Sequence, residues 1–210
     1  MRGASNPIVD HDAVLECARR LVREPSENPP GNEAGVAGVA ERLCKDAGLI
    51  VERIEPAPGR VNLIATLDSG SSGRTLAFNG HLDVVPIVDE SLWEHPPFEA
   101  HVAQGLLHGR GSADMKGAIA AAIAAAHALR DVDFNGKLVL QLVADEEVFG
   151  PLGTARHAGQ EPDQQRLMAG IEPFEQAFFD LGCACVHEAP LIHRRGPLGP
   201  LGPVEVLRSR

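Results

Sequence analysis

Residues 137–147 read KLVLQLVADEE, a near-continuous apolar run that ends at three acidic residues. An apolar run of this length is typical of a strand that is buried on both faces of its sheet. The stretch before it, from about Met115 to Leu129, is rich in alanine, which favours a helix that can pack closely against a sheet. A helix followed by a fully buried strand indicates an α/β fold.

The same alternation of helical and extended patterns runs through the chain upstream. Apolar residues at helical spacing predict one helix from Asp10 until Pro25 ends the pattern, and a second from about Val36 to a stop at Gly48. Strands are predicted at 49–54, 61–67, 75–78 and 106–108. We therefore expect an α/β domain with a mixed, twisted sheet flanked by helices. Its strand ends should converge on one edge, where such folds place ligands.

Composition limits the classes of partner. The chain has 210 residues, 44% of them hydrophobic, and a net charge of −10. This acidity disfavours general binding to nucleic acid or anionic membranes, because their phosphates would be repelled. The N-terminus shows no signal pattern, and the most apolar stretch, 117–129, is shorter than the ~20 residues of a membrane span. We expect a cytoplasmic protein with no nucleic-acid or membrane partner.

The sequence pattern changes after about residue 155. Residues 196–203 read GPLGPLGP, which has little capacity to form a helix or strand. Two interpretations stay open: a genuine flexible tail over 156–210, or a break in the reading frame or gene boundary near residue 155. Cys183 and Cys185 are too close together for the usual spacing of a structural zinc site.

Five ionisable residues fall at the expected ends of strands or helices: His81, Asp83, Asp114, Glu146 and Glu147. Singly, each has an ordinary explanation as a surface pair, a helix cap or a solvated acid. Together they form a ligand set for zinc or another borderline divalent metal. In an extended segment Asp83 points to the same side as His81, and can hydrogen-bond its far ring nitrogen. One of the adjacent glutamates can ligate while the other acts as a base.

Four longer motifs contain these residues: NGHLDVVP at 79–86, a Trp-x-x-x-Pro-Phe at 93–98, GLLHGRGSADMKG at 105–117 and DEE at 145–147. In this order they resemble the dinuclear zinc aminoacylase family. That family includes acetylornithine deacetylase, succinyl-diaminopimelate desuccinylase and carboxypeptidase G. The resemblance covers roughly residues 10–155.

The resemblance implies a zinc-peptidase-like catalytic domain with two divalent ions, zinc first and cobalt or manganese as substitutes. By it, His81 ligates one metal, Asp114 bridges both and Glu147 ligates the second. Glu146 is the general base and Asp83 clamps His81. The implied reaction is hydrolysis of an N-acyl amino acid or small peptide by a metal-activated water. A cis peptide after the bridging aspartate and a homodimer are also usual in the family.

The sequence departs from the family pattern after residue 155. A further acidic ligand is expected in a Gly-Glu-Pro-Thr-like turn, and Glu172 is the candidate, although Ile171 is inserted and the Thr is missing. A distal histidine ligand and the lid or dimerisation domain have no counterpart in this sequence. We therefore interpret 1–155 as the N-terminal part of a metallohydrolase catalytic domain that is divergent or truncated, with weak or no activity. The alternatives are a non-catalytic metal- or partner-binding remnant and an unstable gene fragment.

Overall fold

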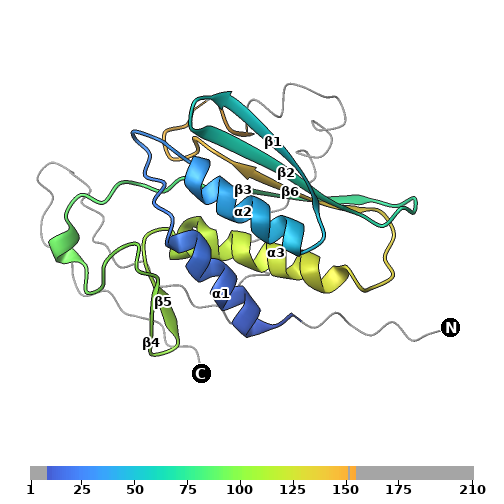
Figure 1. The fold of residues 1–210 in the computed structure, drawn as a ribbon, viewed down its shortest axis with the longest axis horizontal. Coiled ribbons are helices and arrows are strands. Elements are labelled where there is room, and N and C mark those ends of the chain that lie inside the picture. The colour runs from blue at the N-terminus through green and yellow to red at the C-terminus, as the bar shows by residue number, and fades with distance from the viewer. Residues whose placement is uncertain (1–8, 151, 155–210) are drawn as a thin grey trace, which may run out of the picture.

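The computed structural model describes residues 9–150 and 152–154, and its main feature is a four-stranded sheet (Figure 1). The strand order is β1-β2-β6-β3. The strands are β1 (Ile50–Ala57), β2 (Arg60–Asp68), β3 (Thr75–His81) and β6 (Lys137–Val143). β2 runs antiparallel to β1 and to β6, whereas β3 runs parallel to β6. The predicted mixed sheet is confirmed.

In the described part of the chain, three α-helices accompany the sheet: α1 (His11–Val22), α2 (Ala34–Asp46) and α3 (Gly117–Leu129). α2 packs on β1 and β2, α3 packs on β3 and β6, and α1 contacts both of these helices (Figure 1). Asp10 caps α1 by accepting hydrogen bonds from the N–H groups of Asp12 and Ala13. After α2, Gly48 has the positive φ of 89° that its predicted role as a helix stop requires.

Two local expectations were incomplete. The helix expected from about Met115 begins two residues later, because Asp114 and Met115 have non-helical backbone angles. The peptide bond between them is cis, as the family resemblance implied. The short strand β5 (Leu106–His108) does not join the main sheet. It pairs instead with β4 (His101–Ala103), a strand of only three residues that the sequence pattern did not reveal.

The strand directions bring the candidate residues to one edge of the sheet. His81 at the end of β3 lies opposite Val143 at the end of β6, so the segments after both strands leave the sheet together. β2 begins at the same edge, where Oδ1 of Asn62 accepts a hydrogen bond from the N–H of Ala144 at 2.8 Å. Among the described residues, no helix has both the length and the apolar character needed to cross a membrane.

Candidate metal centre

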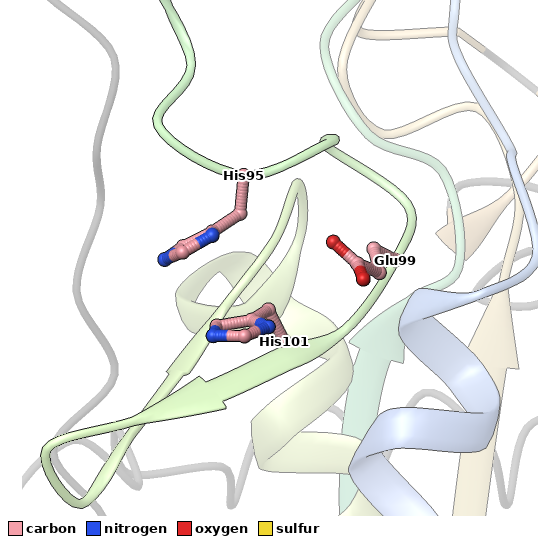
Figure 2. Close-up of side chains that lie close together, drawn as sticks. All are labelled: His95, Glu99 and His101. Carbon is pink, nitrogen blue, oxygen red and sulfur yellow. The ribbon is translucent and has the colours of Figure 1, made fainter.

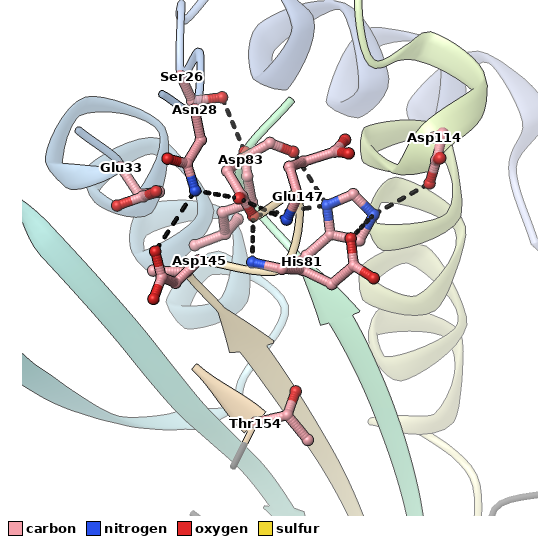
Figure 3. A network of polar contacts seen from close by, with 12 residues as sticks. Ser26, Asn28, Glu33, His81, Asp83, Asp114, Asp145, Glu147 and Thr154 are labelled. Carbon is pink, nitrogen blue, oxygen red and sulfur yellow. Dashed lines mark hydrogen bonds and ion pairs between the residues drawn. The ribbon is translucent and has the colours of Figure 1, made fainter. Parts of the chain in front are cut away.

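His81 is buried at the point where β3 leaves the sheet. Its Nδ1 lies 2.9 Å from the main-chain oxygen of Asp83. A carbonyl oxygen only accepts hydrogen bonds, so Nδ1 carries a proton and donates it. Across the ring, Nε2 lies 3.0 Å from Oδ1 of Asp114 (Figure 3). In the neutral ring this would set a lone pair against a carboxylate oxygen, so the geometry calls for a cation between them, either a proton or a metal ion.

Asp83 is fully buried and joins the two strand ends. Its Oδ1 accepts a hydrogen bond from the main-chain N–H of Glu146 at 3.2 Å, and its Oδ2 from that of Glu147 at 3.0 Å. The side-chain amide of Asn28 also donates to Oδ2, at 2.8 Å. These donors occupy the carboxylate, whose Oδ1 lies 3.6 Å from Nδ1 of His81. That nitrogen instead donates its hydrogen bond to the main-chain carbonyl of Asp83. Asp83 thus orients both the imidazole and the backbone of the two glutamates.

The two glutamates approach the same imidazole. One ring nitrogen of His81 and one carboxylate oxygen from each of Glu146 and Glu147 lie within 4.8 Å of one another. Oε2 of Glu146 is 3.9 Å from Nε2 of His81. The side chains of Glu146 and Asp114 are 52% and 61% exposed, so their oxygens lie on the open side of the site. The structure therefore brings together every predicted site residue that it describes.

The remaining predicted ligand, Glu172, lies outside the described residues. So do the proposed tail at 156–210 and the Cys183–Cys185 pair.

Electrostatics at the site favour positive charge. Burial alone would lower the pKa of His81, but the hydrogen bond to Asp114 and the nearby Asp83 outweigh it and raise that pKa to about 10. Burial also favours a raised pKa for Asp83, yet His81 and the N–H donors around the carboxylate hold its pKa below the usual range. Burial raises the pKa of Glu147. The carboxylates thus hold a proton on the imidazole that an incoming cation would displace.

Four buried polar residues near Asp83 were not predicted as part of the site: Asn28, Glu33 and Asp145, which Figure 3 labels, and Arg60. Arg60 forms ion pairs with Asp145 and, at 3.3 Å, with Glu33. Asn28 joins this group to Asp83, since its Oδ1 lies 3.4 Å from Nη1 of Arg60. Two sequence features could have pointed to these residues. Asp145 belongs to the DEE motif, and Arg60 is a charged residue at the start of an apolar strand.

The loop that carries Asn28 is held against the segment that follows His81. The N–H of Asn28 donates to the carbonyl of Val84 at 2.9 Å, and the N–H of Val84 donates to the carbonyl of Ser26 at 3.0 Å. The hydroxyl of Ser26 donates to the carbonyl of Leu82 at 2.7 Å. These bonds fix the position of the Asn28 amide. The loop that carries Ser26 and Asn28, which the sequence pattern indicates only as a turn, therefore lies beside the site.

The chemistry of the donor set fits a divalent metal ion. One imidazole nitrogen and several carboxylate oxygens are the ligands that zinc and other borderline ions take. The hydrogen bond from Nδ1 of His81 to a carbonyl leaves Nε2 as the coordinating nitrogen, as is usual for metal-bound histidines. Oδ1 of Asp114 lies 3.0 Å from this nitrogen, so a carboxylate adjoins the imidazole. The residues present therefore fit the metal centre that the sequence predicts.

Proteins similar in sequence to this chain include two succinyl-diaminopimelate desuccinylases. The chain is 44% identical over 129 residues to succinyl-diaminopimelate desuccinylase 1 of a Ruegeria species. This alignment covers 60% of the present chain and 33% of that protein. It is 43% identical over 154 residues to succinyl-diaminopimelate desuccinylase of Nitrobacter hamburgensis, covering 68% of this chain and 39% of the relative. The chain thus spans between a third and two fifths of the length of these relatives.

Solved structures show the same fold. Human carnosine dipeptidase 1 aligns with a TM-score of 0.63 at 23% identity, covering 77% of this chain and 37% of that one. An M20 family metallo-carboxypeptidase from Sulfolobus solfataricus aligns with a TM-score of 0.53 at 24% identity, covering 64% and 30%. The model of Peptidase family M20/M25/M40 matches residues 77–186, which are more than half of the chain. The resemblance found in the sequence is confirmed, and the chain belongs to Peptidase family M20/M25/M40.

Proposed function

We propose that this chain carries the N-terminal, metal-binding part of the catalytic domain of a hydrolase that cleaves the amide bond of N-acyl amino acids or small peptides. The observation that carries the proposal is the arrangement at His81, whose coordinating nitrogen faces the carboxylate of Asp114 at 3.0 Å. Glu146 and Glu147 each add a carboxylate oxygen within 4.8 Å of a ring nitrogen of His81. We assign His81, Asp114 and Glu147 as ligands of two divalent ions, zinc by preference, with Glu172 as a further ligand.

The substrate class rests on the relatives. Both sequence relatives are named succinyl-diaminopimelate desuccinylases, so their names describe removal of an acyl group from an amino acid. We extend this class of reaction, and not the succinyl group itself, to the present chain. An acylated amino acid is a small anionic molecule, and the cations of the proposed centre would offset the repulsion that an acidic protein exerts on it.

The residues divide the chemical work between them. When bound, the divalent ions supply Lewis acidity that polarises the amide carbonyl and acidifies a water. Glu146 is the proposed general base: its carboxylate is exposed to solvent, while its main-chain N–H is anchored on Asp83. Its Oε2 takes the proton of the attacking water and returns it to the leaving amine. Asp83 acts as a positioning residue, because its carbonyl and carboxylate hold His81 and the glutamate backbone in place.

The test combines metal binding with turnover. The purified chain is loaded with Zn²⁺ or Co²⁺, and release of free amino acid is followed from N-acetyl and N-succinyl amino acids. Any turnover should be weak and should be lost in Glu146→Gln, which should still bind metal, whereas Glu52→Gln, at an exposed position of β1, should change neither turnover nor metal binding. Metal binding without any turnover would instead make the chain a non-catalytic metal-binding module. Absence of both would refute the proposal.

A further inference from the structure

Three histidines cluster at the β4–β5 hairpin and share no residue with the candidate metal centre. His95 precedes the hairpin, and His101 and His108 lie on its two strands. The rings of His95 and His101 are stacked, with centroids 3.8 Å apart and planes inclined by 24°. The ring of His108 meets that of His95 edge-on at 5.1 Å. The carboxylate of Glu99 points toward the stacked pair (Figure 2).

The backbone holds these side chains together. His101 and His108 are directly opposite one another in the antiparallel ladder, which keeps the Cβ atoms of such a pair about 4.5–5.5 Å apart. The N–H of Glu99 donates to the carbonyl of Pro96 at 3.0 Å, which closes a turn between His95 and β4. This turn is tied to the segment after the hairpin, because the N–H of Arg110 donates to the carbonyl of Pro97 at 2.7 Å.

Side-chain contacts tie the same segment down from two other directions. The guanidinium of Arg110 lies 5.0 Å from the centre of the Trp93 ring, two residues before His95. The Nε of Arg23, just after α1, donates to the carbonyl of Glu99 at 3.4 Å. The cluster therefore belongs to a segment that is fixed at both ends, which is what a preformed ligand site needs.

The donor atoms suit a metal ion. His95, Glu99 and His101 each offer one ligand atom, and these atoms lie within 4.8 Å of one another. Two imidazole nitrogens and one carboxylate oxygen form a three-ligand set that zinc takes in proteins. None of the three side chains is fully buried, so an ion can reach them, and the stacked imidazole rings rotate out of their stack to direct both lone pairs at it.

We propose that His95, Glu99 and His101 bind one borderline divalent cation such as Zn²⁺, at a site separate from the candidate metal centre. The ion links the segment before β4 to the strand itself. That strand leads through β5 into the residues that carry Asp114, so the ion also fixes the polypeptide on the approach to the candidate centre. The site stands on its own residues, and its test does not depend on hydrolytic activity.

The first experiment counts ions. The full chain is dialysed against a fixed concentration of free Zn²⁺, and bound zinc is measured by elemental analysis. His95→Ala/His101→Ala should bind one ion fewer than the wild type. The matched control, His11→Ala/His127→Ala, removes two exposed histidines from α1 and α3 and should bind as many ions as the wild type. An equal zinc content in all three proteins would overturn the proposal.

Two further measurements keep the proposal testable if the double variant does not fold. Glu99→Gln removes one exposed ligand, and should weaken zinc binding at this site at least about tenfold, the lower end of the loss seen even for outer-sphere partners of metal ligands. The control, Glu90→Gln, should bind zinc as the wild type does. In the wild type, zinc should shift the imidazole NMR signals of His95 and His101 in one saturable step and leave those of His127 unchanged. Unchanged signals from the stacked pair would overturn the proposal.

Discussion

Replacing Asp83 by asparagine tests whether one buried carboxylate holds the site together. Asparagine has the same shape, but it offers one acceptor oxygen and one donor amide where aspartate offers two acceptor oxygens. The best placement keeps the oxygen at the Oδ2 position, where it still accepts from Glu147 and Asn28. The amide then faces the N–H of Glu146, which lies 3.2 Å from Oδ1 in the wild type, and two donors oppose one another.

The structure sets the size of the effect. A hydrogen bond to a charged group contributes about 1.5–3 kcal/mol to stability, compared with about 1 kcal/mol for a neutral one. Asp83→Asn loses one charged bond and converts two others to neutral bonds, so the free energy of unfolding should fall by about 3–5 kcal/mol. With a urea dependence of about 2 kcal/mol per molar, the unfolding midpoint should drop by about 2 M.

The assay is urea unfolding followed by far-UV circular dichroism, together with zinc binding of the folded variant. Asp89→Asn is the matched control, because Asp89 also accepts hydrogen bonds from a main-chain N–H and a side chain, those of Ser91, but does so in solvent. The control should leave the midpoint nearly unchanged. An equally small shift for Asp83→Asn would refute the reasoning, because it would mean that the buried carboxylate contributes no more than an exposed one.

Three other changes probe the surroundings of the site. Burial raises the pKa of Glu33 from its ordinary 4.5 to about 7, so the folded chain binds more protons than the unfolded chain between these pH values. The stability of the wild type therefore falls as pH rises through this range. Measured by urea titration, the stability of the wild type relative to Glu33→Gln should decrease between pH 5 and pH 7.5. Burial lowers the pKa of Lys116 from 10.5 to about 7, so wild-type stability relative to Lys116→Met should rise from pH 7 to pH 9, measured the same way. In Gly80→Ala the new Cβ would lie 3.1 Å from Cε of Met115 and 2.8 Å from the Phe78 ring, so the unfolding free energy should fall by about 1–3 kcal/mol, and thermal melts that match the wild type would contradict this crowding.

The sequence was sufficient for the elements whose signals are local. The apolar run at 137–143 and the helical spacing in 11–22 and 34–46 gave strands and helices within a few residues of their observed bounds. The strand ends were expected to converge on one edge of the sheet, and β3 and β6 do end there together because they run parallel. The residues that follow them, including Asp83 and Glu146, were therefore identified before their contacts were known.

The buried polar residues that support Asp83 could not be predicted, because their contacts join residues far apart in the sequence. Asn28 meets Asp83 across 55 positions of sequence, and Arg60 meets Asp145 across 85. No periodicity relates such residues, because their contact depends on the register between β2 and β6 and on the path of a loop. Strand β4 was missed because its His-Val-Ala sequence contains no apolar run, whereas the equally short β5 begins with two leucines and was predicted.

The bonds that Asp83 accepts also bear on the order in which the chain folds. They connect it to N–H groups 63 and 64 positions further along, so they close only after β6 has docked beside β3. Closing so long a loop costs chain entropy before the contacts repay it. These bonds are therefore expected to form after the folding transition state, and weakening them should speed unfolding more than it slows folding. A ligand that binds only the fully folded site would lower the unfolding rate, and would lengthen the lifetime of the folded chain.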